Sequence, residues 1–326
     1  MARLLGGLLA FALAALALGL AAGSSGWGWA TPEILTAVRA PRVLAGFGSG
    51  AALALAGALM QLLTRNALAD PYVLGVSGGA AVGALGALAL GAWTGFALAP
   101  EWALFGGAAV GAFAAAGLLF ALSWRLLGRS GVAGAAESSV ALLLVGVMIG
   151  TAASAVVSML LVLATDVQLR GMVFWLLGDL NGATEWGVVW LAALGALALV
   201  WPTARQLDWL ARGDAWAATL GVPVARRRRT ALAAAALATG AAVATAGAIG
   251  FVGLVVPHAL RLVGARDAAR LLPASALGGG AFVVLADALA RTVVAPVQLP
   301  VGVIAAAVGV PSFLALLLQG TARARR

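Results

Sequence analysis

The sequence predicts an all-α protein that crosses a membrane many times, and three observations lead to this fold class. The 326-residue chain is 63% hydrophobic and 10% charged, whereas soluble domains are about 45–50% apolar and about 25% charged. Apolar stretches recur along the whole chain at about the 20-residue length that a helix needs to cross a bilayer. The 44 glycines cluster within these stretches beside Ala and Ser, where small residues let helices pack closely in lipid.

Ten transmembrane spans are expected. The first, Leu4 to Ala22, resembles a signal peptide in its small-residue end, but its length favours a retained span. Reading Thr230 to Gly264 as one span instead of two would place the C-terminus outside. The other nine expected spans are roughly Arg42 to Leu63, Val73 to Ala92, Trp102 to Trp124, Ser138 to Ala164, Trp186 to Ala204, Thr230 to Gly247, Ala248 to Gly264, Pro273 to Val293 and Val301 to Gln319.

Arginine placement predicts the orientation of the chain. All 20 basic residues are arginine, and with the N-terminus inside only Arg39, Arg42, Arg170 and Arg291 fall outside. The remaining sixteen lie on the cytoplasmic side, the bias typical of inner (plasma) membrane proteins. Both termini are then cytoplasmic. This bias also accounts for the net charge of +9, so we expect no nucleic-acid partner.

Composition excludes several kinds of chemistry. The chain has no Cys, which excludes disulfides and thiolate metal sites. It has no Lys, so it holds no standard nucleotide-binding P-loop. The single His258 excludes multi-histidine metal sets. An intramembrane enzyme would need clustered Asp, Glu or His side chains, which the single His disfavours. We therefore expect a chain that is not an enzyme, with no catalytic, metal or cofactor site.

One polar interval, residues 205–229, interrupts the apolar pattern and is called the insert below. Gly213 and Gly221 are expected to end short helices, on which Trp209, Trp216, Leu220 and Val222 form an apolar contact surface. The insert is expected to be a cytoplasmic docking face within a single domain, 1–326, and the alternative is a plain interhelical loop. Its final run, Arg226 to Arg229, is expected to anchor the topology and contact anionic membrane lipid.

Four stretches together resemble the FecCD-type permeases, the ten-span membrane subunits of ABC importers for ferric siderophores, haem and cobalamin. The resemblance covers essentially the whole chain. Two positions depart from the family pattern, Ala67 in place of Pro and Arg212 in place of Leu. The four stretches are Arg39–Arg42, Asn66–Gly79, Gly247–His258 and Leu271–Leu277.

This resemblance implies roles for two groups of residues. The insert would sit in a cleft of the ATPase subunit and transmit its closure, through Gly213, Asp214, Ala217, Leu220 and Gly221. On the outside, Arg39, Arg42 and Arg291 would receive acidic residues of a substrate-binding protein. For Arg291 the alternative is an ion pair with Asp287, four residues earlier on one helix face.

The fifth span carries three hydroxyl residues on one helix face, Thr151, Ser154 and Ser158. In membrane helices such hydroxyls commonly act as helix-packing contacts. The resemblance implies instead that they line a translocation pathway between two copies of the chain.

The implied assembly is a homodimer with two cytoplasmic ABC ATPase subunits and one periplasmic or lipid-anchored substrate-binding protein. Spans two to five and seven to ten would form an inverted repeat. The substrate would be an iron chelate (siderophore or haem) or cobalamin, with iron chelates favoured. An ion-coupled secondary transporter is the alternative, but it needs intramembrane acids, and only Asp287 and Glu137 approach the bilayer.

Overall fold

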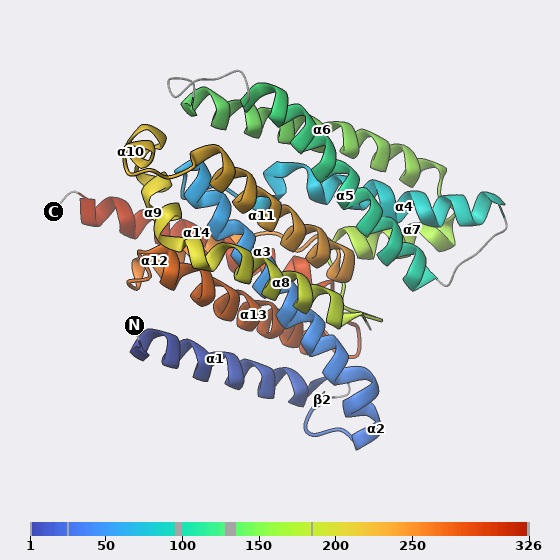
Figure 1. Ribbon diagram of the computed structural model, residues 1–326. Coiled ribbons are helices and arrows are strands. Elements are labelled where there is room, and N and C mark those ends of the chain that lie inside the picture. Colours follow the sequence, from blue (N-terminus) through green and yellow to red (C-terminus); the bar gives the residue numbers. More distant parts are fainter. Residues whose placement is uncertain (1, 25, 95–99, 128–134, 184, 325–326) are drawn as a thin grey trace.

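The computed structural model describes residues 2–24, 26–94, 100–127, 135–183 and 185–324 (Figure 1). Within these ranges the chain is a helical bundle, which confirms the predicted fold class. Eight of the described helices are long and apolar enough to cross a membrane, and two shorter apolar helices accompany them. The ten are α1 (Ala2–Ala21), α3 (Ala40–Thr64), α4 (Val76–Thr94), α5 (Pro100–Leu127), α6 (Ala135–Leu163), α8 (Trp186–Val200), α11 (Val224–Ala246), α12 (Val252–Leu262), α13 (Ala268–Thr292) and α14 (Val301–Ala324).

Short elements connect these helices. A two-stranded antiparallel ladder, β1 (Ala22–Gly23) and β2 (Gly26–Trp27), follows α1. The remaining connections are α2 (Pro32–Ile34), η1 (Leu35–Arg39), η2 (Pro71–Leu74), α7 (Asp166–Leu176), η4 (Trp201–Thr203), α9 (Ala204–Arg212) and α10 (Asp214–Thr219).

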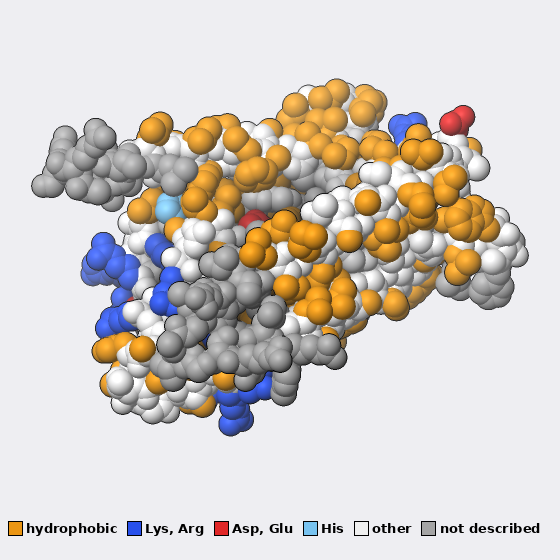
Figure 2. Space-filling model, turned by 90° about the horizontal axis from the view of Figure 1, so that it is seen from above, with side chains coloured by type: hydrophobic (Ala, Val, Ile, Leu, Met, Phe, Trp, Pro, Cys, Tyr) orange, Lys and Arg blue, Asp and Glu red, His pale blue; other side chains and the backbone are white. Residues whose placement is uncertain are grey.

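The beginning of α1, the end of α14 and the pair α9–α10 lie at the same end of the bundle, on the left of Figure 1. We call this the insert end, and the end that carries β2, α2 and α7 the opposite end. Two chain ends on one side require an even number of crossings. Figure 2, turned from that view, shows arginines gathered at the insert end and hydrophobic side chains spread over the rest of this face.

The predicted split of Thr230 to Gly264 is confirmed. Helix α11 ends at Ala246 and α12 begins at Val252. Gly247 makes this break possible, because it adopts φ +67° and a Cβ on it would lie 2.2 Å from the carbonyl oxygen of Trp175. The eleven residues of α12 are shorter than a full span.

Helix α3 occupies the centre of the bundle. Of its most apolar 18-residue window, 94% is buried, against 17% for the corresponding windows of α1 and α6. It packs on α13 at a glycine pair: a Cβ on Gly50 would lie 2.2 Å from the carbonyl oxygen of Gly279, and the reverse distance is 2.3 Å. Close backbone approach through glycine, predicted from the sequence, therefore joins the two helices.

Candidate coupling and docking sites

The insert forms two short helices separated where the sequence predicted. Helix α9 ends at Arg212, and Gly213 follows it with φ +145°. Helix α10 ends at Thr219, and Gly221 follows with φ +77°. L-residues rarely adopt these backbone angles, so both glycines are required by the turns they make.

The side chains of the insert divide into an inner and an outer set. Ala217 is fully buried and Val222 is 6% exposed, and both belong to the hydrophobic core. Trp216 and Leu220 are 42% and 46% exposed. The guanidinium of Arg212 lies 5.6 Å from the centre of the Trp216 ring. Among the residues expected to meet an ATPase, Leu220 and Gly221 therefore lie at the surface.

Asp214 lies inside, with 6% of its surface exposed. Its Oδ1 is 3.3 Å from Nη2 of Arg65, the residue that follows α3, and its Oδ2 is 3.2 Å from Nε of Arg228 in α11. Arg228 also donates from Nη2 to the carbonyl oxygen of Leu63, at 3.3 Å. One carboxylate thus joins the start of α10 to the ends of two long helices.

A second carboxylate of the insert makes a different attachment. Oδ1 of Asp208, in α9, accepts a hydrogen bond of 2.8 Å from the backbone N–H of Ala268, the first residue of α13. The first N–H groups of a helix have no partner within the helix, so this bond caps α13 from another element. Asp267 caps the same terminus by accepting from the N–H of Arg270 at 3.0 Å.

The run Arg226 to Arg229, expected to anchor the topology and contact anionic lipid, has only one buried member. Arg228 is buried in its contacts with Asp214 and Leu63. Nε of Arg227 donates to the side-chain oxygen of Gln206, and Nε of Arg229 donates to the carbonyl oxygen of Ala225. Arg226 is exposed and Arg227 and Arg229 are partly exposed, so lipid contact stays a prediction for these three residues. Periodicity explains the difference, because consecutive residues of α11 point to different faces.

At the opposite end, Arg42 is the centre of a polar cluster. Its Nη2 is 2.8 Å from Oδ1 of Asp287 in α13, and its Nε also donates to that carboxylate. Its Nη1 donates to the side-chain oxygens of Asn181 and of Gln298, the latter at 2.7 Å. Arg42 is 8% exposed, so it joins α3, α13 and two connecting segments within the protein.

Arg291 and Arg39 extend this cluster to α1. Nε of Arg291 is 3.0 Å from Oδ2 of Asp287, which confirms the predicted ion pair. The other guanidinium nitrogens of Arg291 donate to the carbonyl oxygens of Gly19 and Ala22, and Nη1 of Arg39 donates to those of Leu20, Ala21 and Gly28. Two arginines therefore satisfy carbonyls at the C-terminal end of α1, the terminus at which positive charge is favourable.

The three arginines expected to dock a binding protein are thus brought together, but their exposed fractions are only 9%, 8% and 3% for Arg39, Arg42 and Arg291. Arg42 and Arg291 contact the carboxylate of Asp287, and Arg42 is linked through the side chain of Asn181 to the carboxylate of Asp179. Three arginines and two aspartates give this cluster a formal charge of 3 − 2 = +1. The cluster therefore retains a positive field although its side chains are bound within the chain.

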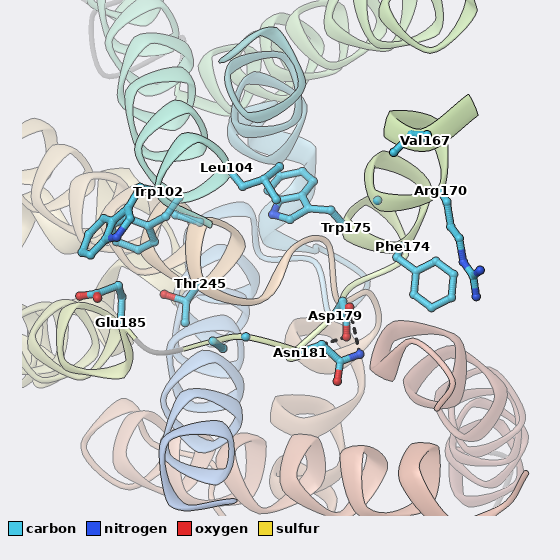
Figure 3. A pocket seen from close by; sticks show the side chains of 15 residues that line it. Trp102, Leu104, Val167, Arg170, Phe174, Trp175, Asp179, Asn181, Glu185 and Thr245 are labelled. Atoms are coloured by element: carbon cyan, nitrogen blue, oxygen red, sulfur yellow. Dashed lines mark hydrogen bonds between the residues drawn. The ribbon is translucent and has the colours of Figure 1, made fainter. Parts of the chain in front are cut away.

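A cavity of about 440 Å³ lies beside this cluster (Figure 3). Asp179 and Asn181, joined by hydrogen bonds, lie between Glu185 and Thr245 on one side and Phe174 and Arg170 on the other. Arg170 is exposed, with its guanidinium 5.7 Å from the centre of the Phe174 ring. Sequence reasoning counted Arg170 among the external arginines but assigned it no site. The sequence feature that could have indicated a site at Arg170 was its position in the polar segment between two spans.

Thr151, Ser154 and Ser158 lie on the exposed face of α6, opposite the buried Ala153 and Leu160. Each hydroxyl donates to the backbone carbonyl oxygen four residues earlier, at 2.9, 3.0 and 2.9 Å respectively. The three side chains therefore use their protons within their own helix. They form a weakly polar strip on the surface of the subunit.

The connection between α3 and α4 carries one titratable group of interest. Oδ1 of Asp70 accepts from the N–H of Tyr72 at 2.8 Å, which caps η2. Burial raises the pKa of the Asp70 carboxyl to about 6, although this hydrogen bond lowers it. The hydroxyl of Tyr72 donates to the carbonyl oxygen of Ile249 at 2.8 Å, which joins the two interruptions at Asp70–Gly75 and Gly247–Phe251.

Comparison with known proteins agrees with this architecture over nearly the whole chain. The chain is 40% identical over 315 residues to the vitamin B12 import system permease protein BtuC of Escherichia coli and of Shigella sonnei, covering 94% of this chain and 92% of each relative. A solved structure described as a metal-chelate type ABC transporter, in an inward-facing conformation, superposes with a TM-score of 0.80 and 26% identity over 97% of this chain and 98% of that one.

A more distant structure, PsaBC from Streptococcus pneumoniae in complex with Fab, shares the fold. Its TM-score is 0.55 at 17% identity, over 88% of this chain and 91% of that one. Residues 7–319 match the FecCD transport family. Because this match spans almost the entire chain and is joined by relatives at 40% identity, the protein belongs to the FecCD transport family.

Proposed function

We propose that this chain is the membrane permease subunit of a binding-protein-dependent ABC importer, and that its substrate is cobalamin or a related corrinoid. The observation that carries the proposal is the 40% identity to vitamin B12 import permeases over 94% of the chain. A metal chelate is the second candidate, because the structure with a TM-score of 0.80 is of a metal-chelate type transporter. Two copies of the chain, two ATPase subunits and one substrate-binding protein would make up the importer.

The insert end would face the cytoplasm and bind the ATPase. Exposed Trp216 and Leu220 supply an apolar contact on a short helix, and exposed Gly221 leaves room for close approach. The insert also lies at the end where arginines gather, as expected for a cytoplasmic surface. ATP binding and hydrolysis in the partner would move the insert, and this chain would perform no bond chemistry.

The opposite end would receive the substrate-binding protein. The positive balance of the Arg39, Arg42 and Arg291 cluster supports this placement, because fields of this kind steer an acidic partner and fix its register. Exposed Arg170 adds a charge that a partner can contact directly. The segment from Thr165 to Glu185, which lines much of the adjoining cavity, would complete the docking surface.

The docking proposal has a test that leaves the buried ion pairs intact. Arg170→Glu should slow association of the binding protein, and the wild-type association rate should fall with added salt, because exposed charges are screened beyond about 8 Å at physiological ionic strength. Arg39→Lys keeps a positive charge near the α1 carbonyls and should associate normally, whereas Arg39→Met should associate more slowly. Association rates that are equal in all three variants and independent of salt would contradict docking at this end.

The strip of Thr151, Ser154 and Ser158 would line the pathway between the two copies. A wall whose hydroxyl protons are already bound within the helix suits a bulky substrate that must pass without being held.

The substrate proposal is tested by competition. Vesicles that contain the complete importer should accumulate labelled cobalamin, and an excess of unlabelled cobalamin should abolish this while a ferric siderophore should not. Accumulation of the ferric siderophore alone would replace cobalamin with the second candidate.

A further inference from the structure

The two carboxylates of the insert attach it to different transmembrane helices. Asp208 bonds to the backbone at the start of α13, through the 2.8 Å contact with the N–H of Ala268. Asp214 bonds to Arg65 at the end of α3 and to Arg228 near the start of α11. Ala268 and Arg65 are 60 and 149 residues away in sequence from the carboxylates they bind, whereas Arg228 is the part of the insert that already belongs to α11.

We infer that Asp208 and Asp214 are positioning residues, which transmit a displacement of the insert to α13, α3 and α11 and do not themselves contact the ATPase. This inference rests on the proposed docking of the ATPase at α10. Asp214 is 6% exposed and both of its oxygens have cationic partners in the chain. The charge of Asp214 is therefore neutralised by arginines of its own chain. Trp216, Leu220 and Gly221 are the residues of the insert that a partner could contact.

Helix α10 has six residues, and isolated helices below about 12–15 residues are marginal in water. Helix α9 is the end of a longer helical stretch, Trp186–Arg212, and Ala217 and Val222 pack in the core. The ion pairs of Asp214 and the cap by Asp208 add directed bonds to this packing, so a force on Trp216 or Leu220 moves the bundle instead of bending the insert.

The receiving helices are joined to each other along their length. Backbone contact at Gly50 and Gly279 prevents α3 and α13 from approaching further, and the Arg42–Asp287 ion pair joins them at the opposite end. The 25 residues of α3 span about 37 Å at 1.5 Å per residue. A displacement received at the insert end would therefore reach the arginine cluster at the opposite end.

A pair of substitutions at Asp208 separates positioning from direct contact. Asp208→Asn keeps a carbonyl oxygen where the N–H of Ala268 can donate to it, whereas Asp208→Ala removes the acceptor. In reconstituted importer, substrate transported per ATP hydrolysed should be preserved in Asp208→Asn and should fall several-fold in Asp208→Ala, because that variant loses the bond between the insert and α13. ATPase assembly should be unchanged in both. Equal impairment of the two variants, or weaker assembly in both, would overturn the inference for Asp208.

Asp214 requires a double-mutant cycle, because its removal leaves Arg228 charged and buried. Transport per ATP is measured for Asp214→Asn, Arg228→Gln and the double variant, each first checked for dimer yield and thermal unfolding. If Asp214 acts through Arg228, the double variant should lose less than the product of the two single losses. Independent, multiplicative losses accompanied by weaker ATPase binding in Asp214→Asn would show a direct contact and overturn the inference.

Leu220→Asp is the matched control for the proposed function. It changes an exposed side chain of the insert and should weaken assembly with the ATPase. If assembly is unaffected, docking at α10 is wrong. If Leu220→Asp weakens assembly while Asp208→Ala transports normally per ATP, docking stands and only the positioning role is wrong.

Discussion

Arg42 and Asp287 are 245 residues apart in sequence and form a buried ion pair, with Arg42 Nη2 2.8 Å from Asp287 Oδ1. The pair joins α3 to α13, and Asp287 simultaneously binds Arg291. A buried charge is costly unless it is paired, so each of these groups depends on the others.

Removing Asp287 should therefore destabilise the protein more than an ordinary surface change. Asp287→Ala leaves two buried guanidinium groups without their carboxylate, and the free energy of unfolding should fall by roughly 3–5 kcal/mol. Thermal unfolding of the purified protein in detergent measures this. Combining Asp287→Ala with Arg42→Met should recover part of the loss, since it removes one of the uncompensated charges, and a double variant less stable than Asp287→Ala would contradict the account.

Glycine packing between α3 and α13 gives a second prediction. Gly279→Ala introduces a Cβ 2.3 Å from the carbonyl oxygen of Gly50, so the two helices must separate. The free energy of unfolding should therefore fall by ~1–3 kcal/mol. Gly86→Ala is the control, because a Cβ there meets nothing within 4 Å. Comparable unfolding temperatures for the two variants would show that close approach at Gly50 does not stabilise the bundle.

Accessibility of the α6 strip can be measured directly, because the chain has no native Cys. Cysteines at Thr151, Ser154 and Ser158 should react with water-soluble thiol reagents in at least one nucleotide state of the assembled importer. A cysteine at Leu191 of α8, whose side chain is 74% exposed in the subunit, should stay unreactive because we expect lipid to cover it. Protection of all three strip positions in every state would identify them as packing contacts.

Titration of Asp70 should be visible in the stability of the protein. Its folded-state pKa of about 6 lies above the ordinary value of 3.8, so the folded state binds the proton more tightly and stability falls as pH rises through this window. Asp70→Asn keeps an oxygen that can accept from the N–H of Tyr72 but cannot ionise. Relative to the wild type, the variant should gain stability between pH 4 and about 7. A stability difference that does not change with pH would show that Asp70 titrates normally.

Much of the fold could be predicted because it follows from local patterns. Hydropathy alone located the long helices, and the glycines of the insert marked where α9 and α10 end. Small residues between Ala246 and Gly250 located the break between α11 and α12.

Long-range pairing was harder to predict from the sequence. The Arg291–Asp287 pair, four residues apart on one helix, could be foreseen, whereas Arg42–Asp287 and Asp214–Arg228 depend on which helices pack together. Burial of Arg39 and Arg42 was missed for the same reason, since their acceptors include carbonyls at the end of α1 and side chains of two distant connections. A charge count can place an arginine on one side of a membrane, but it does not show whether the side chain faces a partner or its own protein.

The central claim is that this permease is driven by an ATPase that docks on the insert. The most direct test is uptake of labelled cobalamin into vesicles that contain the chain, its binding protein and the ATPase, with ATP inside or absent and with an ATPase variant unable to hydrolyse it. We predict accumulation only with ATP and the active ATPase. Accumulation driven by an ion gradient in vesicles that lack the ATPase would contradict the claim and identify a secondary transporter.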